Sequence, residues 1–370
     1  MSQSSAGAQG TRYALSPTQI FTGIGCSRTA IPEIAGFGKR ICAVGGIHGL
    51  AATAPILDAL RVRKRTLDTV EFHGECTQQA IDALAARLAG ADCVLGIGGG
   101  KAIDTAKAAA SDVGLPCITI PTSPATCAAY TPLSILHDDQ GAYLESRRLP
   151  QPLAVMVLDP ELMVGLPARL LSAGCIDALA RAWDTQLAAR CGVPSHMAAL
   201  SVSVCERMWT HTLMPFGFEA LTDCNATRVT PVFTEVLEAC ITGAGLAGQL
   251  GARFFGRSFS HAVGYALADF VNNTVVLHGE AVGLGVLAQC VLDPKTSLSL
   301  HAMRDYFRSV HAPLRFSDLG IDELDGPAGR KLASAAYALL DQARALPFHV
   351  TEEALYQSLL SVEAADKDQA

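Results

Sequence analysis

The chain has 370 residues, half of them hydrophobic, and carries a formal net charge of −7. This length is typical of two domains, and the negative charge argues against a nucleic-acid-binding surface. Twelve cysteines are dispersed without a C-x-x-C pair, so we expect a reduced, cytoplasmic protein rather than a disulfide scaffold. We expect neither a signal peptide nor a membrane span, because the start is small and polar and every apolar run is short.

The first 160 residues alternate apolar runs with runs of helix-forming residues, after a polar start (1–16) that we expect to be loosely attached. Residues 21–25 are a short apolar run followed by turn-forming residues. Strands are predicted over 40–44, 69–72, 93–97, 116–120 and 154–158, with a hairpin that begins at 133 and turns at 138–141. Helices are predicted from 46 to about 61, over 78–88 and over 101–111. This alternation predicts a parallel sheet with helices on both faces.

After about residue 160 helix-compatible runs dominate, for example 171–190, 197–212, 230–249 and 279–292. We therefore predict an α/β domain over residues 1–162 and an all-helical domain over 163–370. An active site is expected between the two, because binding sites prefer domain interfaces.

One stretch of the α/β half combines an apolar strand, a run of glycines and the start of a helix. Gly98, Gly99 and Gly100 follow the strand directly, and the helix is expected to begin at or near Lys101. Glycine lets backbone approach a ligand closely, and a helix N-terminus attracts anions. The stretch therefore predicts a pyrophosphate-binding turn, to which Lys101 and Lys107 would add positive charge.

Asp104 and Thr105 lie in the first turns of that helix, where an acid and a hydroxyl suit the unpaired amide groups. We count Asp104 among the expected cofactor contacts. The stretch does not fit the usual dinucleotide fingerprint, because Lys101 stands where the third glycine is required, and it does not fit a P-loop. A plain strand–helix turn without a ligand is the alternative.

The glycine stretch resembles the signature of the iron-containing alcohol dehydrogenase superfamily, most closely its glycerol dehydrogenase branch. The stretch from Pro121 to Ser134 is closer still to the bacterial hydroxycarboxylate dehydrogenase type, which reduces 2-oxo acids. Later matches, at Asp177, His261 and His278, extend the similarity to about residue 290. The resemblance implies a dehydroquinate synthase-like fold, with an N-terminal nucleotide-binding domain and a C-terminal metal- and substrate-binding domain. It also implies a dehydrogenase that uses a metal ion and NAD or NADP.

Three polar residues of the helical half, Asp177, His261 and His278, stand in apolar or small-residue surroundings. Burying them without partners would be costly. One carboxylate and two imidazoles suit a catalytic zinc or ferrous ion, although each histidine taken singly is also explained as a hydrogen-bonded core residue. Because all three match the family's metal positions in order, the resemblance implies one divalent ion, with zinc favoured over iron.

The resemblance also implies the cofactor contacts. Gly100 and Lys101 match pyrophosphate-side positions. The positions lining the adenine and nicotinamide sites are Thr122, Thr131 and Leu133, and His137 stands where glycerol dehydrogenases have a tyrosine. Many NAD enzymes carry an acid after the first strand to hold the ribose hydroxyls. This chain has Gly46 there, so no carboxylate would repel the 2′-phosphate of NADP.

Two departures from the glycerol dehydrogenase pattern concern the substrate. Cys127 stands where those enzymes have an acid that touches the polyol, and Arg253 stands where they tend to have a glutamate. Losing an acid and gaining a cation favours a small 2-oxo acid, reduced to its 2-hydroxy acid. Gly264 stands where the family has another histidine, so the sequence does not indicate which residues would transfer the proton.

Other functions stay open from the sequence. Glycerol, another polyol or another short alcohol is the main alternative substrate. A sugar-phosphate cyclase of the same fold is a second, although its first metal ligand is usually Glu and it needs a basic cluster. A catalytically silent oligomeric scaffold is a third. For the dehydrogenase we expect a small-molecule substrate and a homo-oligomer, a dimer or higher.

Overall fold

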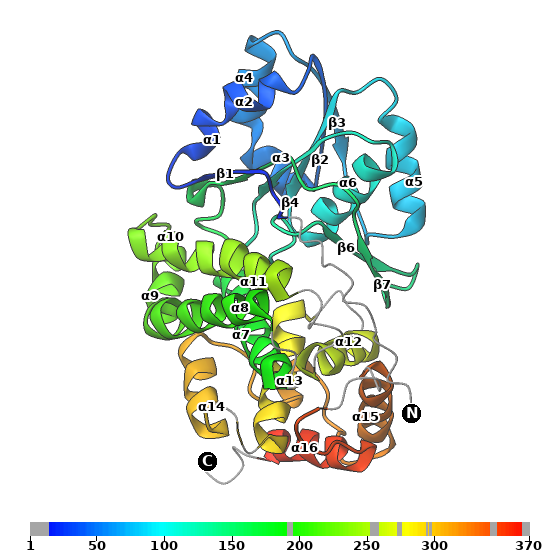
Figure 1. Cartoon of the computed structure of the whole chain (residues 1–370), viewed down its shortest axis with the longest axis vertical. Helices are drawn as coiled ribbons and strands as arrows, with labels where there is room; N and C mark the ends of the chain where they lie inside the picture. Colours follow the sequence, from blue (N-terminus) through cyan, green and yellow to red (C-terminus); the bar gives the residue numbers. More distant parts are fainter. Residues whose placement is uncertain are drawn as a thin grey trace, which may run out of the picture.

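The computed structural model divides into a sheet flanked by helices and a bundle of helices below it (Figure 1). It describes residues 15–190, 195–251, 259–271, 276–293, 295, 298–340 and 346–364. The predicted substrate residue Arg253 and most of the polar start lie outside these ranges. The predicted fold class, an N-terminal α/β part and a C-terminal helical part, is confirmed. The boundary at 162/163 stays a prediction.

Six parallel strands form the main sheet in the order β1-β8-β5-β4-β2-β3. Their bounds are β1 Gln19–Thr22, β2 Arg40–Gly45, β3 Thr66–Glu71, β4 Cys93–Gly98, β5 Cys117–Pro121 and β8 Val155–Leu158. The central strands are continuous apolar runs because both faces of the sheet are covered. The sequence predicts only a short apolar run here, not a strand. In the structure, β1 pairs with β8 from Gln19–Val155 to Thr22–Leu158 and forms one edge of the sheet.

Helices cover both faces of this sheet, as predicted. Their bounds are α1 Cys26–Thr29, α2 Ile31–Gly36, α3 Ile47–Ala52, α4 Ala54–Val62, α5 Gln78–Arg87 and α6 Gly100–Asp112. Helices α1, α2 and α4 pack on one face, against Ile41 and Leu95, and helices α5 and α6 pack on the other, against Val44 and Val94. The helix predicted from 46 to about 61 is divided at Thr53, because the Pro55 that follows suits only a helix start.

The predicted hairpin consists of β6 (Leu133–His137) and β7 (Tyr143–Arg148), which pair antiparallel beside the main sheet. Figure 1 shows it extending toward helix α12 of the helical part.

The helical part begins after a short 3-10 turn, η1 (Pro160–Leu162), and no strand occurs in its described residues. Its α-helices are α7 Ala168–Arg190, α8 His196–Arg207, α9 Met214–Asn225, α10 Pro231–Glu238, α11 Ala244–Gly251, α12 Phe259–Val271, α13 His278–Leu292, α14 Leu300–Ser309, α15 Pro327–Leu339 and α16 Glu352–Ala364. Shorter segments are the π-helical η2 (Met208–Leu213) and η3 (Ala239–Gly243) and the 3-10 turn η4 (Ser317–Leu319). Over the described ranges, no helix has the length and apolar character needed to cross a bilayer.

Candidate metal and cofactor site

Close packing of three helices brings the predicted metal ligands together. Asp177 lies on α7, His261 on α12, and His278 is the first residue of α13. Helix α13 presents Gly279 to α7 and Gly285 to α12, and a Cβ at either position would collide with the backbone of that neighbour. Because glycine has no Cβ, α13 lies directly against both helices. Residues from three separate elements therefore meet at one point.

The three side chains surround a space of the size that a metal ion needs. Oδ1 of Asp177 lies 3.7 Å from Nε2 of His261 and 3.6 Å from Nε2 of His278. Ligand atoms about 2.1 Å from a tetrahedral zinc ion lie about 3.4 Å from one another. Within the described residues, Oδ1 of Asp177 is buried and accepts no hydrogen bond, a costly state for a carboxylate oxygen. A divalent cation would satisfy it, so these residues fit the predicted ion.

Burial and neighbouring charges set the protonation of this group. Burial lowers the pKa of His278 to about 4, so its imidazole is neutral at pH 7, the form that binds metals. Burial opposes the charge on Asp177, but the two neighbouring imidazoles outweigh it and hold the pKa of the carboxyl below its usual range. The group therefore offers one anionic oxygen and a neutral imidazole nitrogen.

A second buried carboxylate, Asp184, contacts the other ring nitrogen of His261, Nδ1. Nδ1 of His261 donates to Oδ2 of Asp184 at 2.6 Å, and the hydroxyl of Ser260 lies 2.8 Å from both carboxylate oxygens. A carboxylate on Nδ1 keeps the proton there and leaves Nε2 to face a metal. Asp184 is not among the residues predicted from the sequence, although its place two helical turns after Asp177 puts both acids on one face of α7.

The glycine turn after β4 has the geometry predicted for an anion-binding seat. Gly98 has a φ of 127°, which strongly favours glycine. Helix α6 starts at Gly100, and its N-cap is Gly99, which has no side chain to cap the first amides. A Cβ at Gly100 would come 3.2 Å from Oγ1 of Thr126. The turn leaves room for a ligand only because these side chains are absent.

Lys101 lies at this turn, as predicted, but it has a protein partner. Its ammonium pairs with the carboxylate of Glu75, whose other oxygen lies 4.0 Å from Nδ1 of His137. Glu75 is not among the residues predicted from the sequence. Lys101 and His137, both predicted cofactor contacts, thus lie beside the same carboxylate, that of Glu75.

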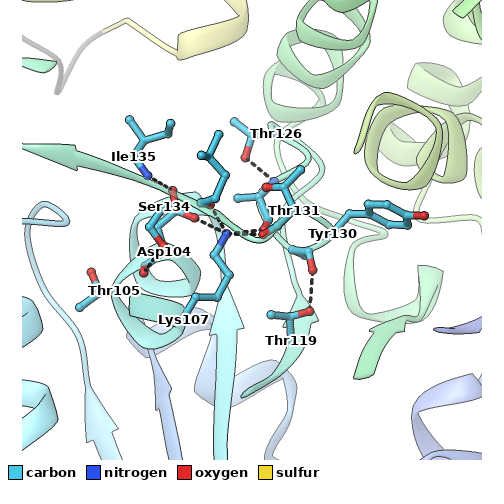
Figure 2. Close-up of polar contacts among 12 residues, drawn as sticks. Asp104, Thr105, Lys107, Thr119, Thr126, Tyr130, Thr131, Ser134 and Ile135 are labelled. Carbon is cyan, nitrogen blue, oxygen red and sulfur yellow. Dashed lines mark hydrogen bonds and ion pairs between the residues drawn. The ribbon is translucent and has the colours of Figure 1, made fainter. Parts of the chain in front are cut away.

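Two predictions about helix α6 are wrong. Asp104 does not serve the first amides: Oδ2 accepts a hydrogen bond from the amide of Ile135 at 3.1 Å, and Oδ1 pairs with Nζ of Lys107 at 2.6 Å (Figure 2). The hydroxyl of Thr105 donates to the carbonyl oxygen of Lys101 instead. The ammonium of Lys107 is buried, so it adds no charge at the glycine turn. Both carboxylate oxygens of Asp104 thus contact protein groups, and its role as a cofactor contact stays a prediction.

The segment that links β5 to β6, here called the 122–133 segment, carries four predicted contact residues: Thr122, Cys127, Thr131 and Leu133. It starts beside the glycine turn, where the amide of Thr122 donates to the carbonyl oxygen of Gly98 at 3.0 Å. It also touches α7, because a Cβ at Gly174 would collide with the backbone of Pro124. The segment therefore lies between the glycine turn and the helix that carries Asp177.

Cys127 is buried within this segment, and burial raises the pKa of its thiol to about 11. The thiol is therefore protonated and uncharged at neutral pH. In the predicted substrate site this residue contributes no negative charge.

Gly46 follows β2 and is the N-cap residue of α3, beside the glycine turn. A Cβ at Gly98 would lie 4.0 Å from the amide nitrogen of Gly46, and a Cβ at Gly46 would meet only the carbonyl oxygen of Phe72, at 3.9 Å. The position thus has room for a side chain but carries no charge.

Two residues that the sequence analysis missed lie beside the metal ligands. Tyr265 of α12 stacks on Tyr143 of β7 with ring centroids 4.3 Å apart, and its ring is 5.5 Å from that of His278. Arg181 follows Asp177 by one turn of α7 and is half-buried, and its positive charge favours the ionised form of Asp177. A tyrosine of the α/β part and a half-buried cation thus both lie near the proposed metal ligands.

The structure also explains Gly264. A Cβ at this position of α12 would come 3.0 Å from the backbone nitrogen of Val282 on α13. A histidine, which the family resemblance implies at this position, would have no space in this chain, because α12 and α13 lie too close together.

Comparisons with known proteins agree with this architecture. A family model described as iron-containing alcohol dehydrogenase matches residues 17–160. The chain is 32% identical to a glycerol dehydrogenase of Pseudomonas putida, over 80% of this chain and 81% of that protein. It is 30% identical to hydroxycarboxylate dehydrogenase A of Escherichia coli strain K12, over 79% and 81% of the two chains. A solved structure of a probable glycerol dehydrogenase from Sinorhizobium meliloti 1021 superposes with a TM-score of 0.82 at 25% identity, covering 96% of this chain and 99% of that one.

Proposed function

The chain belongs to the iron-containing alcohol dehydrogenase family and is a metal-containing, NAD(P)-dependent dehydrogenase, and from this premise we propose that it interconverts a small 2-hydroxy acid and its 2-oxo acid. The main support for this proposal is the position of Arg181. Its cationic side chain projects from the same face of α7 as Asp177, one turn further on. A substrate whose oxygen lies near Asp177 would place a carboxylate within reach of that charge.

Asp177, His261 and His278 would hold the metal ion. A bound divalent ion supplies Lewis acidity toward the substrate oxygen. We favour zinc, because one carboxylate and two imidazoles with an open position are typical of catalytic zinc sites. Asp184 would orient His261 through Nδ1, and the stacked Tyr143 and Tyr265 lie beside the ligands.

The glycine turn would bind the pyrophosphate of NAD or NADP through the first amides of α6. Thr122, Thr131 and Leu133 would line the rest of the nucleotide site, with Gly46 beside the adenosine ribose. A bound nicotinamide would supply or accept the hydride, and the two parts of the chain would hold the substrate carbon beside it.

The character of Cys127 supports an acid substrate over a polyol. Its neutral, buried thiol neither repels a carboxylate nor accepts the hydrogen bonds of several hydroxyls as a carboxylate would. A relative named hydroxycarboxylate dehydrogenase A supports the same choice. Arg253 remains part of the proposal as a second cation.

Glycerol or another polyol is the second candidate, because relatives named glycerol dehydrogenase are equally similar to this chain. The sugar-phosphate cyclase hypothesis finds no support among these relatives. The homo-oligomer and the cytoplasmic location remain predictions.

A spectrophotometric screen of NADH and NADPH with 2-oxo acids and neutral ketones, and of the oxidised cofactors with polyols, tests the proposal. The Arg181→Met variant should lose about tenfold to a hundredfold in kcat/KM on a 2-oxo acid, the value of a charge-assisted contact. It should lose little on a neutral ketone of similar size. Arg330→Met, which removes an exposed arginine paired with Glu353, is the control for net charge. Equal losses on both substrates would make Arg181 structural, and preferential polyol oxidation would favour the second candidate.

A further inference from the structure

Lys107 is a buried lysine whose ammonium donates hydrogen bonds to the backbone of the 122–133 segment. Its side chain has no exposed surface. Nζ donates to the carbonyl oxygens of Ala128 at 2.7 Å, Thr131 at 3.0 Å and Leu133 at 2.6 Å (Figure 2). Lysine is rarely buried without compensation, and here three acceptors match the three protons of the ammonium.

Asp104 completes this arrangement from one turn earlier on α6. Its carboxylate balances the charge of Lys107 at 2.6 Å and accepts the amide of Ile135 at 3.1 Å. The hydroxyl of Ser134 donates to the backbone carbonyl oxygen of Asp104 at 2.9 Å. The two ionic residues of α6 therefore anchor both the end of the 122–133 segment and the start of β6.

The anchored stretch has no regular secondary structure before Leu133, where β6 begins, so its backbone depends on other partners. Every carbonyl from Ala128 to Leu133 accepts a hydrogen bond: Lys107 serves three of them, and the other donors are the side chains of Thr119 and Gln249 and the amide of Leu149. An apolar residue in place of Lys107 would leave three carbonyls without their donor, each at a cost. An ammonium at this position is thus needed to give the stretch a single conformation.

The conformation of this stretch decides the shape of the proposed nucleotide site. Thr126 and Ala128 line the position where a Cβ of Gly100 would stand, at 3.2 and 3.8 Å. Thr131 and Leu133, two of the residues that Lys107 bonds, are predicted cofactor contacts. A segment held in its binding conformation before the ligand arrives binds more tightly than one that must be ordered on binding.

We propose that Lys107, together with Asp104, is a positioning residue for the cofactor, holding residues 128–133 in the conformation that binds NAD(P). The proposal rests on the proposed function only for the identity of the nucleotide. It does not depend on the substrate.

The test is the dissociation constant of NADH or NADPH, whichever wild-type protein binds more tightly, measured by fluorescence without substrate. Lys107→Met, which keeps a chain of similar length, should raise this Kd at least tenfold. Amide hydrogen exchange over residues 128–133 should become faster. Asp104→Asn, which preserves the side-chain volume, should raise Kd by a smaller factor and serves as the second variant if Lys107→Met does not fold.

Leu60→Ala is the control for a merely structural role. Leu60 is fully buried on α4 against the opposite face of the sheet, so its truncation lowers stability without touching the 122–133 segment. The control should lower Tm but change Kd less than twofold. A folded Lys107→Met or Asp104→Asn protein with unchanged Kd would overturn the proposal, as would an equal rise in Leu60→Ala. Failure of the wild-type protein to bind either cofactor would contradict the proposed function itself.

Discussion

Nδ1 of His261 lies 2.6 Å from Oδ2 of Asp184, a carboxylate that follows Asp177 by two turns of the same helix. One helix thus offers both a carboxylate for the proposed metal ion and the acid that orients one of the histidines. The Nδ1 contact fixes which imidazole nitrogen faces Asp177, a choice that the sequence leaves open.

Asp184→Asn should weaken metal binding by about tenfold to a hundredfold, the usual effect of removing a carboxylate behind a histidine ligand. Competition with a chelator, followed by metal analysis, measures the change. Asp223→Asn is the matched control, because Asp223 is also buried but bonds Arg228 and Thr230 instead. Equal metal affinity in the Asp184 variant and the wild-type protein would show that this contact serves folding alone.

His278→Ala should abolish stoichiometric metal binding, because it leaves only two of the three proposed ligands. We expect about one divalent ion per wild-type chain and a small fraction of that in the variant, measured by elemental analysis after gel filtration. His301→Ala, at an exposed histidine beside Asp305, should retain the ion. Full activity of His278→Ala after metal removal would refute a role for the ion in the reaction.

Gly46→Asp should lower kcat/KM for NADPH more than for NADH, because a carboxylate at the ribose would repel the 2′-phosphate. We expect the ratio of the two values to shift about tenfold or more. The backbone tolerates the change, since the nearest atom to an added Cβ is 3.9 Å away. Gly46→Asn separates charge from size and should shift the ratio little. An unchanged ratio in Gly46→Asp would remove Gly46 from the nucleotide site.

Cys127→Asp should change the substrate preference, because an added carboxylate repels a 2-oxo acid and accepts hydrogen bonds from a polyol. We expect at least a tenfold fall in kcat/KM for the 2-oxo acid relative to polyol oxidation. Cys127→Asn has nearly the same shape without the charge and should keep the wild-type preference. If both variants lose all substrates equally, Cys127 contributes packing rather than selectivity.

Features that depend only on neighbours along the chain could be predicted from the sequence. Alternating apolar and helical runs gave the order of elements, because each periodicity is local. The three glycines at 98–100 indicated the turn before α6, since only backbone without side chains suits it. Asp177, His261 and His278 are of types that suit a metal ion, and their match to the family's metal positions predicted the metal group.

Which side chains meet depends on the packing of the whole chain, because those partners lie far apart in sequence. From the sequence, Lys107 is predicted to add positive charge at the pyrophosphate-binding turn. In the structure, its ammonium lies in the interior and donates to the carbonyls of Ala128, Thr131 and Leu133. No local pattern distinguishes a buried lysine from an exposed one on a helix. Asp184 likewise had no visible role until α12 placed His261 beside it, since the cost of burying a carboxylate is met only by a partner that folding supplies.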